Sequence, residues 1–135
     1  YVKVSKFGRT SHVELLNALA QLNHKKCKGL IIDLRGNTGG YMEAAIRMVN
    51  EFLPEGKLIV YTQGRKYPRS EEFANGTGSC QKMPLVVLID EGSASASEIF
   101  TGAIQDNDRG TVVGRRSFGK GLVQRSTSAT ALQSV

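Results

Sequence analysis

Two short runs of mostly apolar residues constrain the fold of this chain more than any other feature of its sequence. They occupy residues 30–34 and 85–89, and each leads through a turn of small residues into a stretch with helically spaced apolar side chains. Such runs, bounded by turn signals, are typical of strands buried on both faces of a parallel sheet. The chain therefore predicts an α/β fold, in which a largely parallel sheet is built from strands that alternate with helices.

The rest of the sequence continues this alternation of strands and helices. A Ser-x-x-Glu capping box at Ser11 predicts the start of one helix, and Pro54 is expected to end the next. Residues 63–82 are polar and irregular, which indicates a surface loop or hairpin. Further strands are expected in four segments: residues 1–7, 58–61, 111–113 and 122–124. We expect a single domain of repeated β-β-α or βαβ units over residues 1–135.

The composition fits one globular domain and excludes several classes of protein. The 135 residues carry a formal net charge of +6, but the basic side chains form no stripe interleaved with aromatics, so nucleic acid is not an expected partner. No stretch approaches the roughly 20 apolar residues of a membrane-spanning helix. Cys27, Cys80, His12 and His24 lack the spacing of a metal site. Because the chain starts at Tyr1 rather than Met, we expect it to be a piece of a longer protein.

A serine in the turn after the second apolar run is the first candidate for catalysis. Residues 92–98 join the expected strand to a helix through glycine, alanine and serine, which presents Ser95 at the carboxyl edge of the sheet. The alternative is that Ser95 merely caps the helix, because Ser95 and Glu98 also fit a capping box. Neither histidine lies in a recognisable triad setting, so the serine needs another base.

Lys120 fits the requirements of that base. In an extended chain Phe118, Lys120, Leu122 and Gln124 share one face, so the lysine has an apolar neighbour on each side. Burial among apolar groups keeps a lysine neutral, and Gln124 can orient its amine by a hydrogen bond. The alternative interpretation is an exposed lysine in a glycine-rich loop.

The turn after the first apolar run offers hydrogen-bond donors. If the two buried strands are neighbours, this turn lies beside Ser95. Backbone N–H groups of Gly39 or Gly40, together with that of Ala96, can then form an oxyanion hole. The alternative is a plain glycine turn.

Taken together, these segments resemble the carboxyl-terminal processing proteases, also called tail-specific proteases. The resemblance covers about residues 1–125 and leaves 126–135 as an unassigned tail. It is carried by three stretches: residues 29–40, 84–99 and 114–124. It implies a crotonase/ClpP-like core in which Ser95 is the nucleophile, Lys120 the base and Gln124 its assistant. The family turn usually reads Asn-Asn-Pro-Gly-Gly, whereas this chain has Thr38 in place of the proline, which loosens the turn.

The resemblance also implies what the protein does. It predicts a serine endopeptidase that cleaves protein substrates near an accessible carboxyl terminus through an acyl-enzyme, without metal or organic cofactor. It implies a PDZ domain elsewhere in the parent protein, and a periplasmic or otherwise extracytoplasmic location.

Three other functions fit parts of the sequence. The first is a binding module of the same fold that has lost catalysis, against which the retention of Ser95, Lys120 and Gln124 argues. The second is a nucleotide-binding domain, because residues 114–120 fit G-x-x-x-x-G-K, but Gly121 replaces the magnesium-binding Ser or Thr. The third is a crotonase-type acyl-CoA enzyme, which has no need of a serine paired with a lysine.

Overall fold

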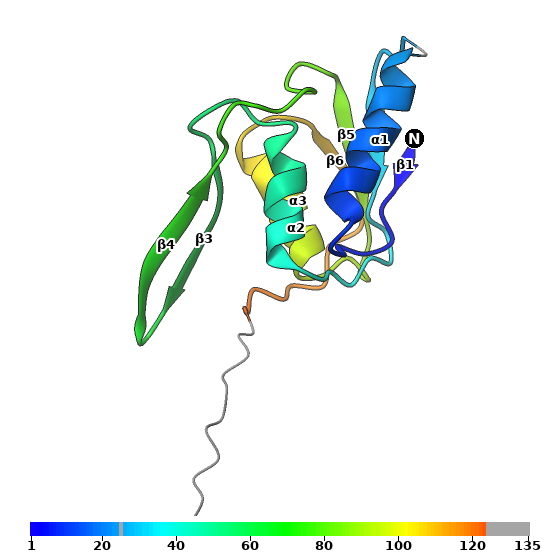
Figure 1. Ribbon diagram of the computed structural model, residues 1–135. Helices are drawn as coiled ribbons and strands as arrows, with labels where there is room; N and C mark the ends of the chain where they lie inside the picture. The colour runs from blue at the N-terminus through cyan, green and yellow to red at the C-terminus, as the bar shows by residue number, and fades with distance from the viewer. Residues whose placement is uncertain (25, 124–135) are drawn as a thin grey trace, which may run out of the picture.

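A four-stranded parallel sheet forms the centre of the computed structural model, which describes residues 1–24 and 26–123 (Figure 1). Its strands, in their order across the sheet, are β1 (Val2–Lys3), β2 (Leu30–Asp33), β5 (Leu85–Ile89) and β6 (Thr111–Gly114). Leu30 lies opposite Leu85, and Val86 opposite Thr111, so the carboxyl ends of neighbouring strands meet at one edge. The predicted α/β class with a largely parallel sheet is confirmed.

Three helices cover one face of this sheet: α1 (Ser11–His24), α2 (Met42–Asn50) and α3 (Ala96–Asp106). Because the strand order never reverses, right-handed crossovers place every helix on the same side. Leu30 and Ile32 are buried beneath the helices, whereas Ile31 points away from them and is 39% exposed. The prediction that residues 30–34 are buried on both faces is therefore wrong for Ile31.

Three phenylalanines pack together in the core: Phe100 from α3, Phe52 from the turn after α2, and Phe7 from the segment before α1. Phe100 of α3 lies 5.9 Å from Phe52 in an edge-to-face contact and 6.3 Å from Phe7, measured between ring centroids. All three side chains are at most 1% exposed. Burying a phenylalanine contributes roughly 1.5–3 kcal/mol, so this cluster fixes α3 and thereby the position of its first turn.

A hairpin projects from this body (Figure 1). It consists of β3 (Leu58–Gly64) and β4 (Tyr67–Phe73), which pair antiparallel in a sheet of their own. The predicted strand at 58–61 is confirmed, although it is longer than expected and lies outside the parallel sheet. The hairpin interpretation is confirmed for the first half of residues 63–82.

Several local predictions are corrected by the structure. Ser11 is the first residue of α1 and its hydroxyl accepts the Gly8 N–H, so it does not form the expected capping box. Of residues 1–7, only Val2–Lys3 form a strand. Residues 122 and 123 lie in no strand, and Gln124 is outside the described residues.

Candidate active site

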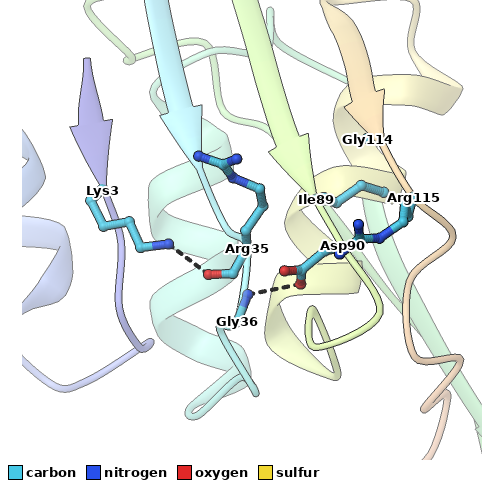
Figure 2. A pocket seen from close by; sticks show the side chains of 7 residues that line it. All are labelled: Lys3, Arg35, Gly36, Ile89, Asp90, Gly114 and Arg115. Atoms are coloured by element: carbon cyan, nitrogen blue, oxygen red, sulfur yellow. Dashed lines mark hydrogen bonds between the residues drawn. The ribbon is translucent and has the colours of Figure 1, made fainter.

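Two turns meet at the carboxyl edge of the sheet, because β2 and β5 are parallel neighbours. Gly39 lies so close to the second turn that a Cβ atom on it would be 2.8 Å from Ser95 Cβ and 3.1 Å from the Ala96 nitrogen. Asp90 also ties the two turns together by accepting the Gly36 N–H at 2.8 Å (Figure 2). The structure thus brings together the glycine turn and the serine, as the sequence suggested.

Ser95 has an unusual backbone conformation. Its φ and ψ angles are 55° and −114°, a region that non-glycine residues rarely adopt and that costs about 1–3 kcal/mol. It occupies the N-cap of α3, with Glu98 in the matching capping-box position, as the alternative interpretation predicted. The Glu98 N–H donates to the Ser95 carbonyl oxygen at 2.8 Å, and the Ser95 N–H donates to the Glu98 carboxylate at 2.9 Å, so two bonds between these residues close the first turn of the helix. Strain at a serine between strand and helix is a feature of nucleophile turns.

The carboxylate of Glu98 connects the serine turn to the lysine segment. It accepts the N–H groups of Ser95 at 2.9 Å and Lys120 at 2.8 Å, both at Oε2. Its other oxygen accepts the Ser117 hydroxyl at 2.8 Å and the Gly119 N–H. Burial raises the pKa of this carboxyl, but the four donors outweigh burial and hold the pKa below its ordinary value.

Ser95 and Lys120 line the same cavity, which has a volume of about 540 Å³. Lys120 itself is exposed, and so are its expected apolar neighbours Phe118 (68%) and Leu122 (78%). The prediction that these residues bury the lysine is therefore wrong in this structure. The reason is that the segment pairs with no described strand, so nothing presses its apolar side chains against the body. Gln124, the expected partner of the amine, lies outside the described residues.

Two backbone amides near Ser95 have no acceptor among the residues that the structure describes. They belong to Gly40, which lines the cavity, and to Ala96, the first residue of α3. An amide in the first turn of a helix has no intrahelical partner and favours negative charge. The Gly39 N–H, by contrast, already donates to Asn37 Oδ1 at 2.9 Å.

Asn37 is a buried site residue that the sequence reasoning missed. Its side chain is 0% exposed, and its Nδ2 donates to the Val4 carbonyl at 2.7 Å. The signal was present, because asparagine between glycines in a tight turn commonly bonds to a backbone group two residues on. Here that group is the Gly39 N–H.

A second hollow of about 460 Å³ lies at the same sheet edge, on the side that Figure 2 shows. Its basic lining residues are Lys3, Arg35 and Arg115. Arg35 and Lys3 pair with the buried Asp33, whose pKa is held far below its usual range mainly by the hydrogen bonds from Arg35. Arg115 pairs with Glu91. Asp90 also lines the hollow, interacts with Arg115 and accepts the Gly36 N–H, so three cations face three carboxylates. The hollow therefore stabilises the first turn and does not present unpaired positive charge to an anion.

The rival sites find little support in the structure. The segment that fits a phosphate-binding loop opens no helix between residues 121 and 123, although such a loop normally leads into one. His12 is hydrogen-bonded to Glu51 at 2.9 Å rather than to Ser95.

A strained serine that shares a cavity with a lysine and unpaired amides is typical of the catalytic cores of hydrolases. Comparison with known families gives the same class. The model described as Peptidase family S41 matches residues 1–134, and the chain belongs to this family.

Individual relatives agree with this membership. The chain is 45% identical over 124 residues to the carboxyl-terminal-processing protease of Synechocystis sp., covering 92% of this chain and 29% of that protein. It is 40% identical over 128 residues to the chloroplastic carboxyl-terminal-processing peptidase 3 of Arabidopsis thaliana, covering 94% of this chain and 24% of that protein. The chain thus spans less than a third of these relatives.

The solved structures confirm the predicted crotonase/ClpP-like core. The photosystem II D1 C-terminal processing protease superposes with a TM-score of 0.85 at 32% identity, over 91% of this chain and 32% of that one. The tricorn protease, with a TM-score of 0.52 at 22% identity, shares the fold.

Proposed function

We propose that this chain is the catalytic core of a serine peptidase that cleaves protein substrates near their carboxyl termini with a Ser95–Lys120 dyad. The observation that carries the proposal is the shared cavity of the two side chains, whose backbones are joined through one carboxylate, Glu98. Membership of Peptidase family S41 and the names of the relatives support the same reaction class.

The reaction proceeds in two halves. Neutral Lys120 takes the proton of the Ser95 hydroxyl as its oxygen attacks a peptide carbonyl carbon. The protonated amine then passes that proton to the leaving nitrogen, which departs as the carboxyl-terminal product. Water attacks the acyl-enzyme with Lys120 as base, which releases the second product and restores Ser95. Gln124 is expected to orient the lysine.

The oxyanion of each half is held by backbone amides. We assign the Gly40 and Ala96 N–H groups to this role, because both are unpaired among the described residues, Gly40 lines the cavity with Ser95, and Ala96 directly follows Ser95. One such donor is worth about 2.7–4 kcal/mol in the transition state. Gly39 contributes by having no side chain, because a Cβ atom at this position would collide with Ser95.

The Lys120 amine must be shielded from water before it can act as a base. A lysine takes up protons only when neutral, and removal of water favours the neutral form. The cavity that it shares with Ser95 has apolar walls that include Val60 and Ile99. A peptide lying in this cavity displaces water from the amine, which couples substrate binding to activation of the base.

The whole protein's partners and location follow the same proposal. Its substrate is a protein or peptide with an accessible carboxyl-terminal tail, delivered by a PDZ domain elsewhere in the protein, in an extracytoplasmic compartment. Among the helices that the structure describes, none has the length and apolar character needed to cross a bilayer.

The test is cleavage of a fluorogenic peptide with a free carboxyl terminus by the intact protein and by its Ser95→Ala variant. Ser95→Ala should lose activity by several powers of ten. Ser5→Ala, at an exposed serine outside the cavity, should keep full activity. Full activity in Ser95→Ala would exclude the dyad. A wild-type protein that binds the peptide without cleaving it would favour the non-catalytic binding module.

A further inference from the structure

The backbone carbonyl of Asn37 reaches across to the turn that carries Ser95. It accepts the Ala94 N–H at 3.0 Å and the hydroxyl of the fully buried Ser97 at 2.8 Å. Its side chain meanwhile holds Gly39 in its own turn. One residue is therefore bonded to both turns of the site.

These bonds flank the two unpaired amides. Gly39 immediately precedes Gly40, and Ala94 and Ser97 lie on either side of Ala96. Asn37 Oδ1 accepts the Gly39 N–H, so of the two glycine amides only that of Gly40 is without an acceptor among the described residues, and Gly40 lines the cavity. The two bonds to the Asn37 carbonyl fix the chain on both sides of Ala96.

We propose that Asn37 is a positioning residue that sets the separation of the Gly40 and Ala96 amides for the oxyanion. This inference rests on the proposed function, because it requires an oxyanion to form. Asn37 is fully buried and acts only through the two backbone segments that it holds. The turn depends more on the hydrogen bonds of Asn37 because the next residue is Thr38. A proline at that position would stiffen the turn without hydrogen bonds.

The expected signature lies in kcat. Negative charge on the carbonyl oxygen develops only in the transition state, so misplaced amides weaken transition-state binding and leave substrate binding nearly intact. A purely structural role for Asn37 would instead lower stability without this selective loss.

The main experiment compares Asn37→Ala with Asn37→Asp in the intact protein. The probes are the cleaved fluorogenic peptide and a peptide aldehyde that ends at the mapped cleavage site, whose adduct with Ser95 places an oxygen between the amides. Asn37→Ala should lower kcat by about 10²-fold and lower the affinity for the peptide aldehyde by a similar factor. It should change KM by less than about threefold. Asn37→Asp keeps an acceptor for the Gly39 N–H, so it should retain more kcat than Asn37→Ala, although its buried carboxylate faces the Val4 carbonyl and lowers stability.

A second variant keeps the proposal testable if Asn37→Ala does not fold. Ser97→Ala removes one donor to the Asn37 carbonyl with little change in volume, and should lower kcat by about five- to tenfold. Thr101→Val is the matched control, because it alters another buried hydroxyl of α3, one with no hydrogen-bond partner in the described part of the chain, and should leave kcat unchanged.

The outcomes distinguish a failure of the proposed function from a failure of the positioning role of Asn37. If Ser95→Ala remains active, the proposed function itself fails. If Ser95→Ala is inactive while folded Asn37→Ala, or Ser97→Ala in its place, keeps the wild-type kcat and aldehyde affinity, only the positioning role of Asn37 is overturned.

Discussion

The Glu98 carboxylate accepts the backbone N–H of Lys120 at 2.8 Å, with the same oxygen that accepts the Ser95 N–H at 2.9 Å. The two residues of the proposed dyad are 25 positions apart in the sequence, yet a single atom links their backbones. Lys120 is exposed, so packing does not hold it in place. Its approach to Ser95 depends on this shared oxygen, on the other Glu98 oxygen, which binds Ser117 and Gly119, and on the Phe118 N–H that donates to the Ser93 carbonyl at 2.9 Å.

Glu98→Gln should therefore reduce catalysis more than stability. The amide replaces one accepting oxygen with an NH₂ group that faces N–H or O–H donors, so one end of the link is lost. Misplacing a catalytic group by about 1 Å can cost about 10²-fold, and we expect kcat to fall at least tenfold while KM changes little. Glu14→Gln, on the exposed part of α1, is the control. Equal kcat values in Glu98→Gln and wild type would contradict the link.

The Glu98 carboxylate should make the stability of the protein depend on pH. Hydrogen bonds hold the pKa of Glu98 below its ordinary value, so the folded state favours the ionised form. This contribution is complete above the ordinary pKa of a glutamate and is lost as the pH falls through the lowered value. In urea unfolding at a series of acidic pH values, the free energy of unfolding should decrease less steeply with falling pH for Glu98→Gln than for wild type. Parallel curves for the two proteins would contradict the assignment.

Lys120→Met should abolish cleavage without destabilising the protein. Methionine keeps most of the side chain's length but provides no base, and the Lys120 backbone N–H to Glu98 is unaffected. We expect kcat/KM to fall by about 10³-fold or more, with the free energy of unfolding within about 0.5 kcal/mol of wild type. Lys28→Met, at another exposed lysine, should match wild type in both measurements. Loss of activity in both variants would point to net charge rather than to a base.

The placement of Ser95 could be predicted from sequence because it depends on local signals. An apolar run, a turn of small residues and a capping pattern fix a strand, its end and the start of a helix. The neighbouring position of the Gly39 turn followed from one further step, since parallel strands bring their carboxyl ends to the same edge. The first step uses periodicity and turn chemistry alone, whereas the second also requires the two strands to be neighbours, which the structure shows.

The surroundings of Lys120 could not be predicted in this way. The alternation of Phe118, Lys120 and Leu122 shows which residues share a face, but burial of that face requires a partner strand, which no local pattern specifies. The bridging role of Glu98 could not be predicted either, because it also depends on a contact between segments that are distant in the sequence. A glutamate three residues after a serine fits a capping box, and only the folded chain shows that its carboxylate also binds a segment about 20 residues later.

Gly39→Ala should disrupt the site by direct collision. The added Cβ would lie 2.8 Å from Ser95 Cβ and 2.9 Å from the Ala94 oxygen, and the φ angle of 109° disfavours any side chain. Gly36→Ala is a matched control, because Gly36 also has a positive φ, of 70°, but no atom of residues 1–24 or 26–123 lies within 4 Å of the added Cβ. We expect Gly39→Ala to lose kcat by about 10²-fold or more, while Gly36→Ala loses about 1 kcal/mol of stability and retains catalysis. Similar kinetics in the two variants would show that backbone strain, and not the contact with Ser95, matters.

Thr101→Val should make the protein more stable. The Thr101 hydroxyl is the only buried side-chain polar group without a hydrogen-bond partner among the residues that the structure describes. A buried polar group left unpaired costs about 1–3 kcal/mol, whereas valine has nearly the same shape and no such group. We expect a gain of about 1 kcal/mol in urea unfolding. Thr101→Ser, which keeps the hydroxyl and loses the methyl group, should instead be less stable than wild type. Because Thr101 lies six residues beyond Ser95 on α3, whose core contacts hold the helix in place, neither change should alter kcat. A valine variant less stable than wild type would mean that the hydroxyl has a partner in the intact protein.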